Sequence, residues 1–177
     1  MSALEPAEPI VELVLEDPRW SEAVPDLDAV AERAAELAFS ETGRTAGGWR
    51  IALLACSDAR ITGLNAQFRG RDAATNVLSW PAFAPPIPEP GPGGPPLHLG
   101  DLALALETTR NEAEAAAIPL KAHAVHLILH GCLHLLGYDH ETEVDAAVME
   151  GVETRALARL GLDDPYSRGD AATPHSD

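Results

Sequence analysis

The sequence predicts an α+β fold in which a small mixed β-sheet of about four strands packs with about five helices. Two observations support this prediction. Short β-prone runs dominate the first part of the chain, and segments with helical periodicity cluster in the later part. One of the later segments is apolar on nearly every side, so we expect it to form the central, buried helix of the fold.

Four runs have the composition of strands. The run at 49–56 is almost continuously apolar, which is typical of a strand in the middle of a sheet. The run at 75–80 is ended by Pro81. The expected strands cover residues 10–15, 49–56, 75–80 and 97–106.

Five segments carry helical periodicity or helix-end signals. Ser57 is the expected N-cap of one helix, Gly70 is its expected stop, and Thr142 begins the last helix with a capping-box pattern. The expected helices cover residues 26–40, 58–69, 107–117, 119–136 and 142–161. The last helix is expected to bury one face, formed by Val144, Val148, Val152 and Leu160.

The length of 177 residues suits one domain, which we place at residues 1–162, followed by a flexible tail at 163–177. Residues 81–96 hold eight prolines and three glycines, which predicts a mobile surface loop that acts as a spacer. A proline-recognising partner is the weaker interpretation of this loop.

The net charge of −16 argues against a non-specific binder of DNA or RNA, which needs a broad basic surface. Cys56 and Cys132 lie in apolar runs and suggest no disulfide framework, as expected in a reducing compartment. Residues 1–8 lack the pattern of a signal peptide, and the apolar run at 122–136 is too short to span a bilayer. We therefore expect a cytoplasmic protein without membrane contact.

The most informative stretch is 130–140, which holds His130, His134 and His140. Two histidines four residues apart lie on one helix face and can share a metal ion. Gly137 is a typical helix-ending residue, so the chain can turn back and bring the third histidine to the same ion. Three neutral nitrogen ligands with an open fourth position predict one catalytic Zn²⁺ per chain.

Two further histidines precede this cluster. His123 is expected to be a satisfied core residue. His126 lies four residues before His130, so it can serve either as a group behind the ligands or as a fourth ligand that closes the site.

The spacing matches the pattern of zinc hydrolases, His-x-x-x-His-x-x-Gly-x-x-His. The peptidases with this pattern carry a glutamate directly after the first histidine, which serves as general base. Gly131 occupies that position here, so a glutamate-dependent peptidase mechanism lacks its base.

A phosphodiester is a plausible alternative substrate, because the 2′-hydroxyl of RNA supplies an internal nucleophile. Arg69 is the best candidate cation for the phosphate, although a charge at the end of a helix also complements the helix dipole. Asp101, Asp139 and Glu141 are candidate proton acceptors, and the residues favour none of them.

The stretch His-Gly-Cys-Leu-His-Leu-Leu-Gly-Tyr-Asp-His closely resembles the signature of the YbeY-type bacterial endoribonucleases, an rRNA maturation factor family. Residues 64–72 with 75–81 resemble a second block of that family, and 99–101 resembles a third. The resemblance covers about residues 10–160. Two departures are Trp80, where phenylalanine is usual, and the proline-rich loop, which is longer than typical.

The resemblance implies a zinc-dependent, single-strand-specific endoribonuclease that matures the 3′ end of small-subunit (16S) rRNA and acts in ribosome quality control. It implies that the three histidines ligate zinc and that Arg69 is catalytic. The expected substrate-binding residues are Arg69, Arg71, Thr75, Asn76 and Ser79. The expected partners are single-stranded rRNA and the small ribosomal subunit or its assembly proteins.

Two other hypotheses stay open from the sequence: a metallopeptidase-like zinc hydrolase, and a non-catalytic ribosome-assembly factor with a structural metal. The acidic charge is compatible with an RNA enzyme if Arg69, Arg71 and the metal form a local positive cleft. The surrounding acidity then disfavours unspecific RNA binding.

Overall fold

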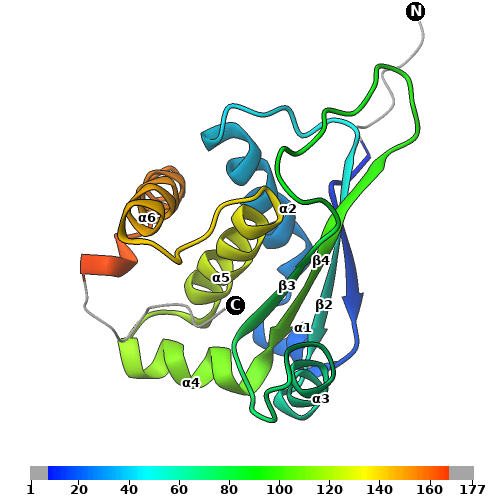
Figure 1. Ribbon diagram of the computed structural model, residues 1–177. Helices are drawn as coiled ribbons and strands as arrows, with labels where there is room; N and C mark the ends of the chain where they lie inside the picture. Colours follow the sequence, from blue (N-terminus) through cyan, green and yellow to red (C-terminus); the bar gives the residue numbers. More distant parts are fainter. Residues whose placement is uncertain (1–7, 168–177) are drawn as a thin grey trace, which may run out of the picture.

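The computed structural model describes residues 8–167 and has a four-stranded mixed sheet surrounded by helices (Figure 1), which confirms the predicted α+β class. In chain order the elements are β1 (Val11–Leu15), α1 (Arg19–Ala23), α2 (Leu27–Glu41), β2 (Trp49–Cys56), α3 (Asp58–Arg69), β3 (Val77–Pro81), β4 (Leu97–Ala105), α4 (Leu106–Ala116), α5 (Leu120–Leu135) and α6 (Glu143–Ala158).

The strand order in the sheet is β1-β2-β4-β3. β1, β2 and β4 run parallel, and β3 pairs antiparallel with β4 at one of the two edges of the sheet. β2 is therefore an inner strand, as its apolar composition predicted. The register between β2 and β4 shifts by one residue, because Arg50 pairs with His98 and Ile51 with Gly100. Leu99 is the extra residue of this bulge.

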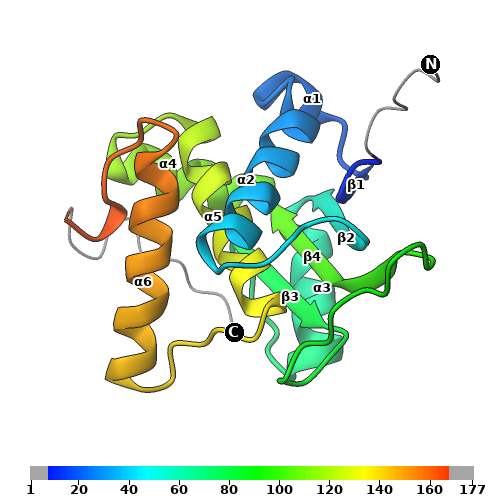
Figure 2. The same cartoon turned by 90° about the horizontal axis from the view of Figure 1, so that it is seen from above.

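Helices cover the two faces of the sheet unequally. α2 and α5 pack together on one face and α6 lies behind them, whereas α3 lies against the opposite face (Figure 2). Alternation along the strands follows this division. In β3, for example, Val77 belongs to the large core on the α5 side, and Leu78 belongs to a small cluster with Ile61 of α3.

α5 is the central helix, as the sequence predicted, and all its residues from 123 to 135 are buried. Its apolar character is that of a core helix. Among the described residues, no single helix is long and apolar enough to cross a membrane, and only α4 and α5 together, bent by 116° where they meet, have the length and composition to do so.

Two local predictions were incomplete. The short helix α1 was not expected; it buries Trp20, whose indole Nε1 donates to the carbonyl of Cys56 at 3.0 Å. On α6, the predicted buried face was right for Val152, which is buried, and for Leu160, which packs against the core, but Val144 and Val148 are 74% and 52% exposed. The buried side chains of α6 are Met149, Val152, Glu153, Ala156 and Leu157.

The proline-rich loop is anchored at its start, which differs from the predicted free spacer. Phe83 packs edge-on against Trp49 at a ring distance of 5.9 Å, and Ile87 is buried. A Cβ on Gly137, just past the end of α5, would lie 3.0 Å from Pro85. The first residues of the loop therefore pack against the region that holds the histidines.

The segment predicted as a tail also begins with ordered structure. Residues 165–167 form a helical turn in which Pro165 is buried and Tyr166 is half-buried. Asp164 Oδ1 accepts from the Tyr166 amide at 2.9 Å and from the Thr154 hydroxyl at 3.3 Å, which ties the turn to α6. Residues 1–7 and the rest of the predicted tail, 168–177, lie outside the described residues.

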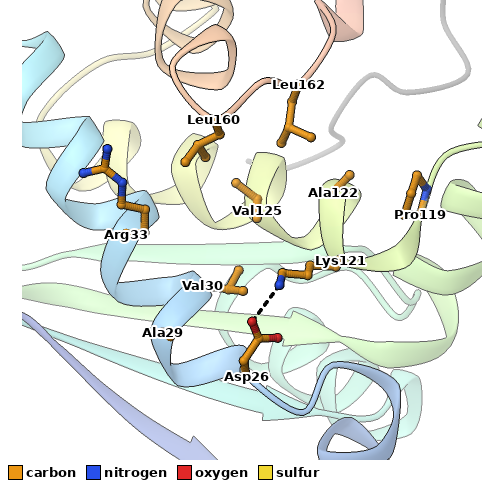
Figure 3. A pocket seen from close by; sticks show the side chains of 10 residues that line it. All are labelled: Asp26, Ala29, Val30, Arg33, Pro119, Lys121, Ala122, Val125, Leu160 and Leu162. Atoms are coloured by element: carbon orange, nitrogen blue, oxygen red, sulfur yellow. Dashed lines mark hydrogen bonds and ion pairs between the residues drawn. The ribbon is translucent and has the colours of Figure 1, made fainter.

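A hollow of about 420 Å³ lies between α2, the start of α5 and the segment after α6 (Figure 3). Its lining is largely apolar, and Asp26 and Lys121 form an ion pair of 2.6 Å at its rim. None of the three clustered histidines lines it, so this hollow is separate from the candidate metal centre.

Gly100 follows the bulge and is required there. Its φ is 155°, and a Cβ would lie 2.5 Å from the Trp80 carbonyl oxygen and 2.6 Å from Leu135 Cδ2. We expect Gly100→Ala to lower the free energy of unfolding by about 2 kcal/mol or more in urea denaturation of the metal-free protein.

Gly63→Ala is the matched control, because Gly63 lies within α3 and a Cβ there meets no atom within 4 Å. It should raise the free energy of unfolding by about 0.5–1 kcal/mol. Wild-type stability of Gly100→Ala would show that the sheet and α5 approach each other less closely than described.

Candidate metal centre

The end of α5 returns the chain towards its own last turn. Gly137 has a φ of 95°, and the Tyr138 amide donates to the Leu133 carbonyl at 3.0 Å. This left-handed ending was predicted from Gly137 and satisfies the last carbonyls of the helix. The turn directs the following residues back along the helix, so that His140 reaches the histidines of α5.

His130, His134 and His140 form a cluster. Each of the three residues contributes one ring nitrogen, and these three nitrogens lie within 4.8 Å of one another. His130 and His134 are 3% and 8% exposed, whereas His140 is exposed. The structure therefore brings together the three residues predicted as metal ligands, in a group that is buried on one side and open on the other.

The two helix histidines are each held through Nδ1. His134 Nδ1 donates to the Tyr138 carbonyl at 2.9 Å, and His130 Nδ1 lies 2.5 Å from Glu153 Oε1. A neutral imidazole that donates from Nδ1 carries a lone pair on Nε2. Both residues therefore turn an acceptor nitrogen towards the centre of the cluster.

These two acceptor nitrogens lie only 3.1 Å apart. Two lone pairs at that distance repel each other unless a cation lies between them. Two nitrogens bound to one tetrahedral zinc at about 2.05 Å are separated by about 3.3 Å, close to the observed spacing. The donor set therefore fits a metal ion, and the three histidines would hold it with an outer position open to solvent.

The electrostatics keep the helix histidines neutral. Burial, and then the neighbouring His130 and His140, lower the pKa of His134 to about 4. Burial also lowers the pKa of His130, although Glu153 opposes this effect. Burial alone would raise the pKa of Glu153, but His126 and His130 beside it outweigh burial and lower that pKa to about 2. At neutral pH the two helix histidines are thus uncharged imidazoles with a carboxylate behind them.

Glu153 was missed from the sequence. It lies on the buried face of α6, four residues after Met149 and three before Ala156, and its side chain is fully buried. An acidic residue on the apolar stripe of a helix is the signal that could have revealed it, because a buried carboxylate requires partners. That signal was hidden because the predicted buried face of α6 included the exposed Val144 and Val148 and left out Met149 and Ala156.

The earlier histidines of α5 have separate surroundings. His123 is a fully buried core residue, as predicted, and its Nε2 lies 2.9 Å from Glu112, although its buried Nδ1 has no hydrogen-bond partner. His126 is not part of the cluster among the described residues, and its Nε2 lies 3.7 Å from Glu153. The cluster therefore does not contain the fourth histidine that would close it.

Arg69 lies in the last turn of α3, before Gly70, which ends the helix as predicted. Its guanidinium donates from Nη2 to the backbone carbonyl of Ser79 in β3. Since β3 is an edge strand of the sheet and also contacts α5, it lies between Arg69 and the helix of the metal ligands. Arg69 therefore reaches the sheet edge from the face opposite α5.

The other residues expected to bind substrate divide into two groups. Arg71 is exposed and Thr75 is half-buried, both in the turn before β3. Asn76 and Ser79 are only 0% and 2% exposed, so neither offers surface to a substrate in this structure. The Asn76 amide donates to Glu112 at 3.0 Å and its Oδ1 accepts from the Val77 amide, which are internal contacts.

None of the three carboxylates considered as proton acceptors is singled out. Asp101 pairs with His98 on β4 at 3.0 Å, and Asp139 accepts from the amide of Glu141 at 3.3 Å. The best-defined carboxylate at the cluster is Glu153, which lies behind the ligands and not on their open side.

Comparison with known proteins identifies the family of the chain. A family model described as endoribonuclease YbeY matches residues 16–161. The chain belongs to the YbeY endoribonuclease family. A Ruegeria pomeroyi protein named endoribonuclease YbeY is 47% identical across 89% of this chain and 98% of its own length. One of the same name from Cereibacter sphaeroides is 48% identical across 90% and 99%.

Membership of the YbeY family confirms the resemblance found in the sequence. A solved structure of a Thermotoga maritima protein covers 85% of this chain and 91% of its own, with a TM-score of 0.53 and 20% identity. At this identity the likeness concerns the fold alone, and it agrees with the α+β architecture described above.

Removal of one ligand should abolish metal binding without loss of the fold. In His134→Asn, the side-chain amide can still donate to the Tyr138 carbonyl, but no nitrogen replaces Nε2. Loss of a group that only orients a ligand lowers metal affinity by up to roughly 100-fold. Because His134→Asn removes the ligand itself, we expect a larger fall in zinc affinity. Competition with a chromophoric chelator measures it, with His98→Ala, at an exposed position of β4, as control. Unchanged affinity of His134→Asn would exclude His134 as a ligand.

The metal-free protein should become less stable in mild acid. The unfolded chain protonates His134 near its ordinary pKa of 6.5, whereas the folded protein does so near 4. Between these values the unfolded state binds more protons, so the free energy of unfolding falls as the pH falls, by about 3 kcal/mol from this residue. Urea denaturation of chelated protein from pH 7 to 4 measures this loss. His134→Asn should show a shallower slope, and equal slopes would contradict the assignment.

Proposed function

We propose that this protein is a zinc-dependent, single-strand-specific endoribonuclease that acts in maturation of the 3′ end of small-subunit rRNA. The observation that carries the proposal is the pair of Nε2 atoms of His130 and His134, 3.1 Å apart and both turned towards His140. Membership of the YbeY family, whose curated relatives are named endoribonucleases, supports RNA as the substrate.

The chain's own residues can perform two parts of the reaction. The three histidines would hold zinc, which when bound supplies a Lewis acid for a phosphodiester oxygen and lowers the pKa of water. Arg69, with its planar guanidinium, would grip the phosphate and stabilise the charge that develops on it. Arg71 and Thr75, in the turn before β3, would contact the neighbouring RNA backbone.

A peptidase is disfavoured by the packing of α5. A Cβ on Gly131 would lie 2.8 Å from Leu102 Cδ2 of β4, so this position faces the sheet. A glutamate there would enter the core and would not reach the open side of the site. A purely structural metal is disfavoured because His126 stands apart from the three-histidine group found in the described part of the chain.

The proposed partners are single-stranded rRNA and the small ribosomal subunit or its assembly proteins, in the cytoplasm. The net charge of −16 supports a protein that meets RNA through a small local contact and not through a broad basic surface. Association with a ribosomal particle would then supply the affinity that the acidic body lacks. Strong binding to bare RNA, independent of zinc and Arg69, would contradict this part of the proposal.

The decisive experiment compares cleavage of a single-stranded RNA from the 3′ end of the small-subunit rRNA with cleavage of the same strand in a duplex. Wild-type protein should cut the single strand, whereas chelated protein and His134→Asn should not. Equal cleavage by all three would indicate a contaminating nuclease, whereas no cleavage of the single strand by pure, zinc-loaded wild-type protein would overturn the proposal.

Arg69→Glu should keep the zinc affinity and lose cleavage by about 100-fold or more, as expected for loss of a group that stabilises developing charge. Arg60→Glu is the matched control, since it makes the same charge change at an exposed position of α3. Arg69→Lys keeps the positive charge but removes the planar guanidinium, so it separates the effect of paired hydrogen bonds from that of charge. Cleavage by Arg69→Glu at the wild-type rate, with the fold verified by circular dichroism, would exclude the role of Arg69.

A further inference from the structure

A buried carboxylate lies directly behind one of the metal ligands. Glu153 of α6 is fully buried, and its Oε1 lies 2.5 Å from His130 Nδ1. Removing a charged carboxylate from water is costly, and the site would be cheaper to build with an apolar residue. Its placement against a ligand therefore points to a role at the metal.

The other carboxylate oxygen of Glu153, Oε2, is bound by a residue that follows α6 in the chain. The Tyr166 hydroxyl donates to Glu153 Oε2, and the Tyr166 ring lies edge-on to His126 at 5.9 Å. Asp164 holds the turn that carries Tyr166, because it accepts from the Thr154 hydroxyl next to Glu153. The chain after α6 thus reaches back to the rear of the cluster.

His126 competes for the same oxygen. Its Nε2 lies 3.7 Å from Glu153 Oε2, beyond hydrogen-bond distance, and both of its buried ring nitrogens lack a hydrogen-bond partner in the structure. A small rotation of the carboxylate would satisfy His126 at the expense of His130. The Tyr166 hydroxyl occupies Oε2 and opposes that rotation.

We propose that Glu153 and Tyr166 are positioning residues of the metal centre. Glu153 fixes the tautomer and orientation of His130, so that its Nε2 lone pair faces the ion, and its negative charge offsets part of the charge of a divalent cation. Tyr166 fixes Glu153 and makes residues 163–167 part of the site. The inference rests on the proposed metal centre and is independent of the RNA chemistry.

The test measures zinc affinity by chelator competition and the visible spectrum of the cobalt-loaded protein, with Glu153→Gln and Tyr166→Phe. Loss of an orienting partner lowers metal affinity by about 10–100-fold, so Glu153→Gln should lie in this range. Tyr166→Phe removes only a hydroxyl and should cost roughly 10-fold, at the low end of that range. Both should alter the cobalt spectrum, which reports the ligand geometry.

Glu112→Gln is the matched control. Glu112 lies 2.9 Å from the Nε2 of His123, so it is also a carboxylate paired with a buried histidine of α5, but that histidine is not a ligand. We expect Glu112→Gln to lower the stability of the metal-free protein and to leave the zinc affinity and the cobalt spectrum unchanged.

Wild-type affinity and spectrum in both Glu153→Gln and Tyr166→Phe would overturn the inference, and so would an equal loss of affinity in Glu112→Gln. Because the readout is metal binding, failure of the wild-type protein to cleave RNA would count only against the proposed function. Failure of the wild-type protein to bind zinc would overturn both.

Discussion

The fold is constrained by one helix that carries four imidazoles through an apolar core. His123, His126, His130 and His134 of α5 are all 8% exposed or less. A buried polar group without a partner costs about 1–3 kcal/mol, and neighbouring elements supply partners to three of the four, whereas the ring nitrogens of His126 have no hydrogen-bond partner. α4 supplies Glu112 to the first of these histidines, α6 supplies a carboxylate to the third, and the turn after α5 supplies a carbonyl to the fourth.

The same constraint divides the metal centre into a closed rear and an open front. The rear is formed by α6 and by the turn that ends α5, which hold the Nδ1 atoms of the helix histidines. The front is the side of the exposed His140. Gly131 lies against the sheet, so the position from which peptidases with the same histidine spacing supply a base is directed into the core. A reaction at this site must therefore draw its other groups from elsewhere, and the edge strand β3 with Arg69 is where the proposal places them.

Local signals in the sequence predicted what local geometry controls. Ser57 accepts from the amide of Arg60, Gly70 takes the left-handed conformation at the end of α3, and Thr142 caps α6. These features depend on one to four neighbouring residues, so they can be recognised without knowledge of the fold. The buried face of α6, which was predicted only in part, and the internal contacts of Asn76, which were not predicted, depend on segments distant in the chain.

By itself, the sequence determined that His130, His134 and His140 can meet at one ion, because helical spacing and a helix-ending glycine act over only eleven residues. It also determined the fold class and the family resemblance. Only the tertiary structure decided what stands behind those ligands, since Glu153 and Tyr166 reach them by packing of α6 and the following turn. Such contacts have no periodicity in the chain, and they arise only when the elements are packed together.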